Sequence, residues 1–396
     1  MHRHVCQPNV HEKAMKIIVA PDKFKGTFSA SEAAITITEG IRLACNAASY
    51  SDMDIVMKPM ADGGEGSLEI LAGKDGQIIN AATFDALMRP TASPYAVMPD
   101  KHTAVIEAAS SIGLYKTARH ERNPLLTTSF GLGTVIRTAI EAGCNDITVT
   151  IGGSATSDCG VGMLAAMGCM FYDMHGVPIP HPCGADMPRI LHIDPTPLYA
   201  LTQGVRFQIL SDVDNPLLGP EGAAAVFAPQ KGADAATITT LEKGAASFSA
   251  EATAVTGRDF RSAAGSGAAG GIGWALRTFC DARLTPGAPY IAEYIGLEEA
   301  LKGAALVITG EGRFDTQSLP GKTTGYVASL ARRHGIPVMV MCGAREHGIQ
   351  SNRLIEAGIT AVCATTDNAP YPSAFTRSKE ALRQMTCDAF HYLLAQ

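Results

Sequence analysis

Four short runs rich in Val and Ile recur along the chain, and each is bounded by Gly, Pro or Asp. They occupy residues 16–20, 147–151, 305–309 and 338–341. Continuous apolar runs of this length are typical of strands that are covered on both faces, as in a parallel sheet. Helical periodicity follows each run, which is the alternation expected of βαβ units. The sequence therefore predicts an open α/β sheet.

Two stretches fit this alternation badly, because they are richer in Pro and contain long turn clusters. They are residues 63–125 and 169–261, and we expect them to form a second, discontinuous α/β domain. The remaining segments, 15–62, 126–168 and 262–396, are expected to form a Rossmann-like or flavodoxin-like domain around the parallel sheet. A chain of 396 residues with 46% hydrophobic residues is long enough to bury two cores.

Composition excludes several classes of protein. A net charge of −6 argues against a nucleic-acid partner, because affinity for a phosphate backbone needs clustered Lys and Arg. The ten cysteines include no CxxC pair, which argues against a disulfide framework and a zinc site and favours reduced thiols in a cytoplasmic protein. No apolar stretch approaches the ~20 residues of a membrane span, so we expect no membrane partner.

Residues 1–14 contain His and Lys but no apolar core, so they fail as a signal peptide. We expect this N-terminal extension to be poorly ordered. Met15 opens the first predicted strand and is a candidate for the functional start.

The segment ITVTIGGSATSDCGVG, which begins at Ile147, runs from a strand through a Gly-rich turn into a helix. In that geometry, backbone N–H groups and the helix N-terminus converge on one anion site. Two glycines would let a phosphate approach, two hydroxyls would donate hydrogen bonds, and one carboxylate could hold Mg²⁺ against the phosphate. In that order, these residues are Gly152 and Gly153, Ser154 and Thr156, and Asp158. The alternative is a capped helix after a tight turn, which explains one polar residue and not four.

A second strand and loop, LVITGEGRFD, carries Glu311 and Asp315 just past the carboxyl end of its strand. Open α/β sheets bind ligands at that end, so both carboxylates are candidate metal ligands. The chain continues to a GKT triplet that suggests a P-loop, but position 316 is Thr where the P-loop requires Gly. Lys322, in that triplet, is either a phosphate ligand or a solvated surface lysine.

Residues 265–270 read GSGAAG and match the GxGxxG pattern. A polar segment precedes them instead of a buried strand, so the dinucleotide-binding fingerprint lacks its context. Gly267 and Gly270 are candidates for a nucleotide-facing or hinge loop, and close packing is an equal alternative.

Two acidic clusters follow further strand-like runs. The first, ADGGEG, contains Asp62 and Glu65, and the second, SDVDNP, contains Asp212, Asp214 and Asn215. Such pairs usually mark turns, but their repetition at strand ends indicates a shared acidic cleft. Magnesium-dependent phosphoryl transfer needs carboxylates for the metal, one carboxylate for the attacking hydroxyl, and cations for the transferred charge. The cations available are Lys23, Lys25, Lys231 and Lys322.

Seven segments occur in an order that resembles the bacterial glycerate kinase family, in its type 1 form, from Met15 nearly to the C-terminus. They are IVAPDKFKG at 18–26, ADGGEG at 61–66, RNPLLTTSFGLG at 122–133, IGGSATSDCG at 151–160, SDVDNPLLGPEGAAAVFAPQKGA at 211–233, GAAGGIG at 267–273 and TGEGRFD at 309–315. The resemblance implies a two-domain α/β protein with its active site in the cleft between the domains. It also implies that ATP and Mg²⁺ are used to phosphorylate D-glycerate to 2-phosphoglycerate.

Three positions depart from the family pattern. Lys23 stands where these kinases usually carry Ser, Cys159 replaces a common Gly, and Thr324 takes the place of a usual Pro. A lysine in the substrate loop adds positive charge close to the acid, so the departures bear on the substrate more than on the type of reaction.

The residues and the resemblance together predict roles. We expect the 152–158 loop to bind the ATP phosphates and Mg²⁺, Lys25 to act in catalysis, and Asp212 or Asp214 to orient the substrate hydroxyl or accept its proton. Lys25 with Arg122 or Arg137 would hold the glycerate carboxylate. The substrate-binding candidates are Lys23, Asp62, Glu65, Arg122 and Asn215.

Three alternatives remain open on the sequence alone. They are a kinase of a related small hydroxy acid, an NAD-dependent hydroxy-acid dehydrogenase, and a catalytically silent metabolite-binding paralogue. Oligomeric state is also open, with a homodimer as one option.

Overall fold

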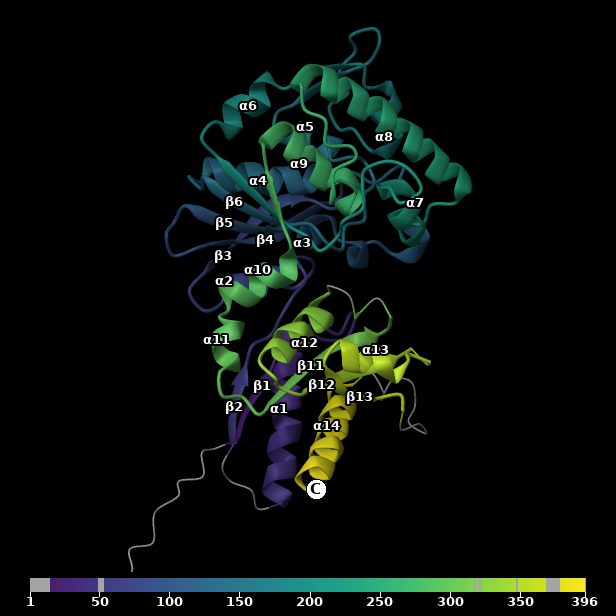
Figure 1. The fold of residues 1–396 in the computed structure, drawn as a ribbon. Helices are drawn as coiled ribbons and strands as arrows, with labels where there is room; N and C mark the ends of the chain where they lie inside the picture. Colours follow the sequence, from purple (N-terminus) through teal and green to yellow (C-terminus); the bar gives the residue numbers. More distant parts are fainter. Residues whose placement is uncertain are drawn as a thin grey trace, which may run out of the picture. The chain divides into compact units, whose positions relative to one another are not determined.

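The computed structural model describes residues 15–48, 53–316, 318–319, 322–346, 348–367 and 378–395. The expectation of disorder for residues 1–14 lies outside the described residues. The chain divides into two compact units (Figure 1). The first unit comprises Met1–Pro59 together with Gly296–Gln396, and the second unit is the single stretch Met60–Ile295, which is inserted into the first.

The first unit is built on a five-stranded parallel sheet with the order β13-β12-β11-β1-β2. The strands are β1 (Met15–Val19), β2 (Met53–Met57), β11 (Leu306–Phe314), β12 (Val338–Arg345) and β13 (Ile359–Ala364). The helices are α1 (Ala30–Ala47), α11 (Leu297–Leu301), α12 (Thr323–Arg333), α13 (Ser351–Glu356) and α14 (Lys379–Leu394). Helices α1 and α14 lie side by side (Figure 1), and they share a hydrophobic core with alternate residues of β1, β11 and β12.

Helix α1 begins where the sequence supplies a capping box. Ser29 precedes the helix in an extended conformation, and its hydroxyl accepts a hydrogen bond from the Glu32 amide at 3.2 Å. The Glu32 carboxylate accepts in return from the Ser29 amide at 2.9 Å. This reciprocal pairing satisfies two of the amides that a helix start leaves open, and it fixes where the chain turns after β1.

The second unit contains a six-stranded mixed sheet with the order β10-β9-β6-β5-β4-β3, in which β4 is antiparallel to both of its neighbours, β3 and β5, and the other pairs are parallel. The strands are β3 (Gln77–Phe84), β4 (Pro90–Val97), β5 (Thr103–Glu107), β6 (Asp146–Thr150), β9 (Arg206–Leu210) and β10 (Arg283–Thr285), with β7 (Met170–Tyr172) and β8 (His192–Asp194) forming a separate pair. The helices are α2 (Ser67–Ala72), α3 (Ala108–Ile112), α4 (Phe130–Glu141), α5 (Val161–Ala166), α6 (Thr196–Thr202), α7 (Ala223–Phe227), α8 (Ala235–Thr256), α9 (Ile272–Cys280) and α10 (Gly287–Tyr294).

The predicted α/β class with parallel sheets is confirmed, and all four Val- and Ile-rich runs form strands (β1, β6, β11 and β12). The division along the chain differs from the sequence-based one. Strand β6 is hydrogen-bonded between β5 and β9, so residues 126–168, and residues 262–295 with them, lie in the second unit. A buried parallel strand has the same apolar pattern in either sheet, and the pattern alone could not assign β6 to its neighbours.

Candidate functional site

In the second unit, two glycine-rich loops meet through their backbones. The amide of Gly152 donates to the carbonyl oxygen of Gly63 at 3.2 Å, and a Cβ on Gly152 would lie 2.7 Å from the Cα of Gly64. On its other side, Gly153 accepts a hydrogen bond at 2.8 Å from the amide of Leu114. Gly153 has a φ of +80°, a conformation that favours glycine. The turn after β6 is therefore held between two other loops.

A buried lysine supports the same turn from within. The Nζ of Lys231 donates to the carbonyl oxygen of Thr156 at 2.5 Å and to the Ser154 hydroxyl at 3.4 Å. Lys231 is only 3% exposed, and burial lowers its pKa to about 8, although the charge of Asp158 acts in the opposite direction. The Thr156 hydroxyl is buried and has no hydrogen-bond partner among the described residues. In the sequence, Lys231 is only one of four candidate cations, because the burial of a lysine leaves no pattern there.

Asp158 occupies a different kind of environment from the one predicted. Its side chain is fully buried and accepts from the Ser129 amide at 2.7 Å, the Ser129 hydroxyl at 2.8 Å and the Gly160 amide at 3.1 Å. Burial raises the pKa of Asp158, and these hydrogen bonds oppose the rise. The carboxylate thus connects the starts of α4 and α5 by hydrogen bonds. This is the structural role, a cap at a helix start, that the sequence left open as the alternative to metal binding. We do not retain Asp158 as a metal ligand.

Asp212 and Asp62 are brought together at the start of α10. The carboxylate of Asp212 accepts from the amides of Gly287 at 2.7 Å and Ala288 at 3.1 Å. A Cβ on Gly287 would lie 2.3 Å from the carbonyl oxygen of Asp62, so only glycine fits between them. The Asp62 carboxylate in turn accepts from the Gly64 amide at 3.1 Å. The two acidic clusters therefore share one region, as the sequence predicts, and Gly287 joins them.

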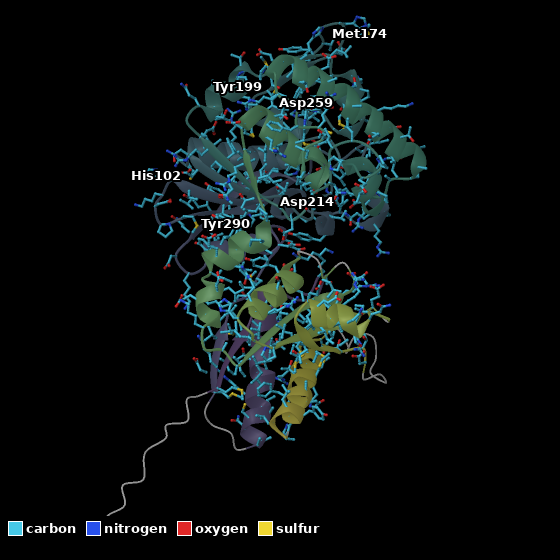
Figure 2. All side chains as sticks on the ribbon, viewed as in Figure 1. His102, Met174, Tyr199, Asp214, Asp259 and Tyr290 are labelled. Carbon is cyan, nitrogen blue, oxygen red and sulfur yellow. The ribbon has the colours of Figure 1, made fainter. Side chains whose placement is uncertain are left out.

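The remaining members of the second cluster differ in exposure. Asp214, labelled in Figure 2, is exposed. The Asn215 amide donates to the carbonyl oxygen of Glu221 at 2.8 Å, which folds the 211–222 loop back on itself. Asp214 is thus the exposed carboxylate of the SDVDNP cluster, while Asp212 accepts from the first amides of α10.

Sequence reasoning missed Glu107 at the end of β5. This side chain is 4% exposed and accepts from the amides of Gly66 at 2.8 Å and Leu68 at 3.2 Å. It also accepts from the Ser110 hydroxyl at 2.9 Å. Glu107 therefore anchors the loop that carries Asp62 and Glu65. Its only signal in the sequence is a carboxylate directly after an apolar run.

The glycines of the GSGAAG segment serve close packing. A Cβ on Gly270, which has a φ of +68°, would lie 2.2 Å from the carbonyl oxygen of Thr156. A Cβ on Gly267 would lie 2.3 Å from the carbonyl oxygen of Pro216. These contacts favour the packing alternative for both residues.

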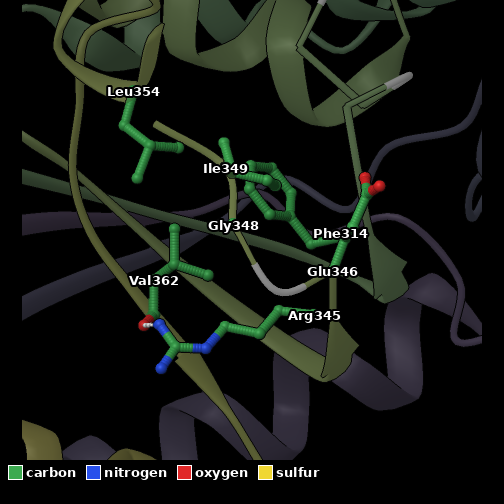
Figure 3. A pocket seen from close by; sticks show the side chains of 7 residues that line it. All are labelled: Phe314, Arg345, Glu346, Gly348, Ile349, Leu354 and Val362. Carbon is green, nitrogen blue, oxygen red and sulfur yellow. Dashed lines mark hydrogen bonds between the residues drawn. The ribbon is translucent and has the colours of Figure 1, made fainter. Parts of the chain in front are cut away.

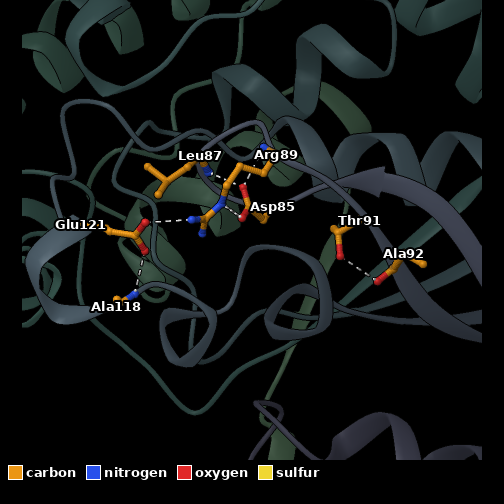
Figure 4. Close-up of polar contacts among 7 residues, drawn as sticks. All are labelled: Asp85, Leu87, Arg89, Thr91, Ala92, Ala118 and Glu121. Carbon is orange, nitrogen blue, oxygen red and sulfur yellow. Dashed lines mark hydrogen bonds and ion pairs between the residues drawn. The ribbon is translucent and has the colours of Figure 1, made fainter.

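The two arginine candidates also have structural partners. The guanidinium of Arg122 donates to the carbonyl oxygens of Thr117 at 3.2 Å and Leu114 at 3.3 Å. The segment before it is fixed by Arg89, which pairs with Asp85 at 2.5 Å and Glu121 at 2.8 Å (Figure 4). Arg137 forms an exposed i,i+4 pair with Glu141 on α4. Arg122 is thus held by backbone carbonyls and Arg137 by Glu141, and their role in holding the glycerate carboxylate stays a prediction.

In the first unit, the turn after β1 lies against β11. The amide of Asp22 donates to the carbonyl oxygen of Gly310 at 2.8 Å, and the Asp22 carboxylate accepts from the Lys23 amide at 2.7 Å. A Cβ on Gly312 would lie 3.1 Å from the amide nitrogen of Lys25. Lys23 is 8% exposed and Lys25 is exposed. The two lysines therefore lie beside the carboxyl-terminal part of β11, where Glu311 is located.

Glu311 is the most perturbed carboxylate at this end of the sheet. Burial raises its pKa to about 7, the hydroxyls of Thr324 and Ser318 act in the opposite direction, and the charge of Asp22 adds to the rise. Its Oε1 is buried and has no hydrogen-bond partner among the described residues. An orphaned buried carboxylate oxygen is costly unless a ligand completes it.

Around Glu311, other groups fit an anion and a cation. Lys322 is the N-cap residue of α12, and the adjacent Thr323 is 1% exposed, with a hydroxyl that has no hydrogen-bond partner among the described residues. The Asp315 amide donates to Ser318 Oγ at 3.1 Å. Within the described parts of the chain, no group of three or more His, Cys, Asp or Glu side chains is arranged to hold a metal.

A profile of the glycerate kinase family matches residues 17–394. The chain belongs to the glycerate kinase family. Glycerate kinase of Bacillus subtilis (strain 168) is 39% identical over 376 residues, which cover 94% of this chain and 96% of the relative. Glycerate 2-kinase of Escherichia coli (strain K12) is 36% identical over 346 residues, covering 85% and 89%.

A crystal structure from Salmonella typhimurium LT2, assigned to glycerate kinase 2, has a TM-score of 0.77 and 35% identity over 96% of this chain and 99% of its own. The predicted family resemblance is thus confirmed, and with it the expectation of a kinase. In this glycerate kinase family member, no helix within the described ranges is long and apolar enough to span a membrane.

Proposed function

We propose that the protein transfers the γ-phosphoryl group of ATP to a hydroxyl of D-glycerate, with Mg²⁺, and releases 2-phospho-D-glycerate and ADP. Family membership supports the acceptor, and one relative is named a 2-kinase. The observation that carries the proposal is the buried carboxylate of Glu311. It lies at the carboxyl end of a parallel sheet, where ligands of such folds bind, and one of its oxygens lacks a partner among the described residues.

Glu311 and Asp315 would hold Mg²⁺, with phosphate oxygens and water as the other ligands. When bound, the cation would neutralise charge on the transferred phosphoryl group. Lys322 and the first amides of α12 would bind phosphate oxygens, because the helix start has no side-chain cap and its dipole favours an anion. The Gly152–Thr156 turn remains our second proposed contact for the phosphates, with its conformation held by Lys231.

Asp214 and Asp212 are the proposed groups for the substrate hydroxyl. Asp214 is exposed and free to reach a small acid, whereas Asp212 is oriented by two amides of α10. Lys25 and Lys23 are proposed to attract the glycerate carboxylate. Asp62, Glu65 and Asn215 stay candidates for substrate hydroxyls, since the Asp62 and Glu65 loop adjoins Asp212 through Gly287.

A coupled ADP-release assay tests the function. We expect D-glycerate to stimulate ADP release only when both ATP and Mg²⁺ are present, and phosphorus NMR to assign the phosphate to the 2-position. Binding of ATP and the acid without ADP release would instead identify a silent metabolite-binding protein. A product phosphorylated elsewhere would retain the kinase and overturn the regiochemistry.

A related hydroxy acid is the second candidate substrate, and the observation that favours it is Lys23. This residue is 8% exposed beside the Asp22 carboxylate, in a loop where the family usually carries Ser. A higher kcat/KM for a near analogue than for D-glycerate, measured side by side, would decide for it. We also propose a reducing, cytoplasmic location, because every cysteine in the described segments is a free thiol.

A further inference from the structure

A pocket of about 210 Å³ opens in the first unit at the carboxyl ends of β11 and β12 (Figure 3). Its walls combine apolar and polar surface and come from four different segments: the end of β11, the loop after β12, helix α13 and strand β13. The apolar side chains are Phe314, Ile349, Leu354 and Val362. Two charged residues, Arg345 and Glu346, together with Gly348 complete the lining.

Both charged side chains are already engaged with the protein. Arg345 donates to the Asp367 carboxylate at 3.0 Å and to the carbonyl oxygen of Val362 at 3.4 Å. Glu346 accepts from the Thr316 amide at 2.9 Å. These partners hold the two side chains in place, and the Asp367 carboxylate, which does not line the pocket, balances the guanidinium charge. The pocket therefore suits a flat, largely neutral group with a polar edge better than it suits a small anion.

The position of the pocket relates it to the proposed phosphate and metal residues. Phe314 and Glu311 belong to the same strand, three residues apart, which corresponds to roughly 10 Å along β11. A ribose and its first phosphate can bridge such a gap. The volume is below the roughly 300 Å³ at which pockets for whole small ligands begin, so it fits one ring system and not a complete nucleotide.

We propose that this pocket binds the purine base of the nucleotide, which sets the phosphates toward Glu311 and Lys322. The inference rests on the proposed use of ATP. Phe314, Ile349 and Leu354 would contact the faces of the base, and the rim near Glu346 and the Val362 carbonyl would meet its polar edge. Glycerate has no apolar face of this kind and would not be retained here.

Two neighbouring residues of α13 provide a matched pair for the test. Leu354 lines the pocket, while Ile355 is 72% exposed and does not. Calorimetric titration would use three probes: ATP, adenosine, and inorganic tripolyphosphate, which has no base. Leu354→Ala is expected to weaken the binding of ATP and of adenosine at least about fivefold, because an apolar contact with the base is lost, and to leave the binding of tripolyphosphate unchanged. Ile355→Ala is expected to change none of the three.

A second variant fills the pocket instead of emptying it. Val362→Phe is expected to weaken the binding of ATP and of adenosine. The binding of tripolyphosphate should stay unaltered, which would show that the residues that bind phosphate are intact. Unchanged ATP affinity in both Leu354→Ala and Val362→Phe would overturn the proposal. If the wild-type protein also phosphorylates D-glycerate, that result leaves the proposed function standing. Conversely, loss of adenosine binding in a protein that cannot phosphorylate D-glycerate would support the pocket and reject the reaction.

Discussion

The backbones of Gly152 and Gly64 are in van der Waals contact: a Cβ on Gly152 would lie only 2.7 Å from the Cα of Gly64. The adjacent hydrogen bond from the Gly152 amide to the Gly63 carbonyl fixes the contact. The two glycine-rich segments are therefore one structure, although they are far apart in the sequence. A glycine that admits a phosphate and a glycine that admits another loop look the same in a sequence.

Gly152→Ala is expected to lower both Tm and kcat/KM, the latter at least about tenfold, because the added methyl group forces the two loops apart. Thermal unfolding and steady-state kinetics measure the two effects. Gly143→Ala is the control, since a Cβ there meets nothing within 4 Å and reports only the strain of a φ of +100°. Wild-type values of both quantities for Gly152→Ala would show that the loop contact is dispensable.

Lys231→Met is expected to change how stability depends on pH. The pKa of Lys231 is lowered from 10.5 to about 8 by burial, so between these pH values the unfolded chain binds one proton more than the folded protein. The free energy of unfolding of the wild type should therefore rise with pH in this window, relative to the variant. Urea unfolding from pH 7.5 to 10.5 measures the difference.

Lys243→Met provides the comparison for that experiment, because Lys243 is an exposed lysine on α8. It should follow the wild-type curve. If the free energies of unfolding of the wild type and Lys231→Met depended on pH in the same way, burial would not lower the pKa of Lys231. Lys231→Met should also lower kcat, since the Thr156 carbonyl loses its partner.

Glu311→Gln is expected to raise the free energy of unfolding of the metal-free protein at pH 8. It is also expected to lower the activity of the enzyme assayed with Mg²⁺. The folded pKa of Glu311, about 7, lies above its unfolded value of 4.5, so the wild type loses stability as pH rises from about 4.5 to 7. Glutamine has no such titration, and the gain should fade as the pH falls through this window. Urea unfolding of the chelator-treated protein measures the stability. In steady-state assays, the kcat of Glu311→Gln should be at least about tenfold below that of the wild type.

The exposed Glu356, at the end of α13, supplies the control for this pair of measurements. Glu356→Gln should alter neither stability nor kcat. If Glu311→Gln left kcat at the wild-type level, Glu311 would have no part in the reaction.

Asp212→Asn and Asp214→Asn separate orientation from chemistry. Asp212→Asn is expected to lower Tm and kcat together, because the loop loses a charged acceptor at the α10 start. Asp214 is exposed, so Asp214→Asn should lower kcat with Tm unchanged. Values of kcat within about threefold of wild type for both variants would remove both residues from the transition state.

The sequence predicts the strands well, because each buried strand carries its own apolar run. It also predicts that the clusters of Asp62 and Asp212 share a region, which they do, although the two residues follow strands of different sheets, β2 and β9. The sequence does not show whether Asp158 is a metal ligand or a buried structural carboxylate. The hydrogen bonds that Asp158 accepts from Ser129 depend on a contact between residues 29 positions apart.

The residues that sequence reasoning missed act through tertiary contacts. Glu107 holds the amide of Gly66, which is 41 positions away, and Gly287 touches the backbone of Asp62. The pocket at Phe314 and Leu354 is equally invisible in a linear pattern, because four segments supply its walls and each reads as ordinary core.

The insertion of Met60–Ile295 into the first unit has a consequence for protein synthesis. Strand β1 becomes an interior strand of the sheet only when β11 pairs with it, and the Thr309 hydroxyl donates to the carbonyl oxygen of Ala20, 289 positions earlier. At ribosomal speeds of roughly 5–20 residues per second, the emerging β1 and β2 wait for tens of seconds with one edge unpaired. The inserted unit is continuous in the chain, so it can complete its own sheet during that interval. In nascent chains, residues 60–295 should therefore become resistant to protease before the first unit does.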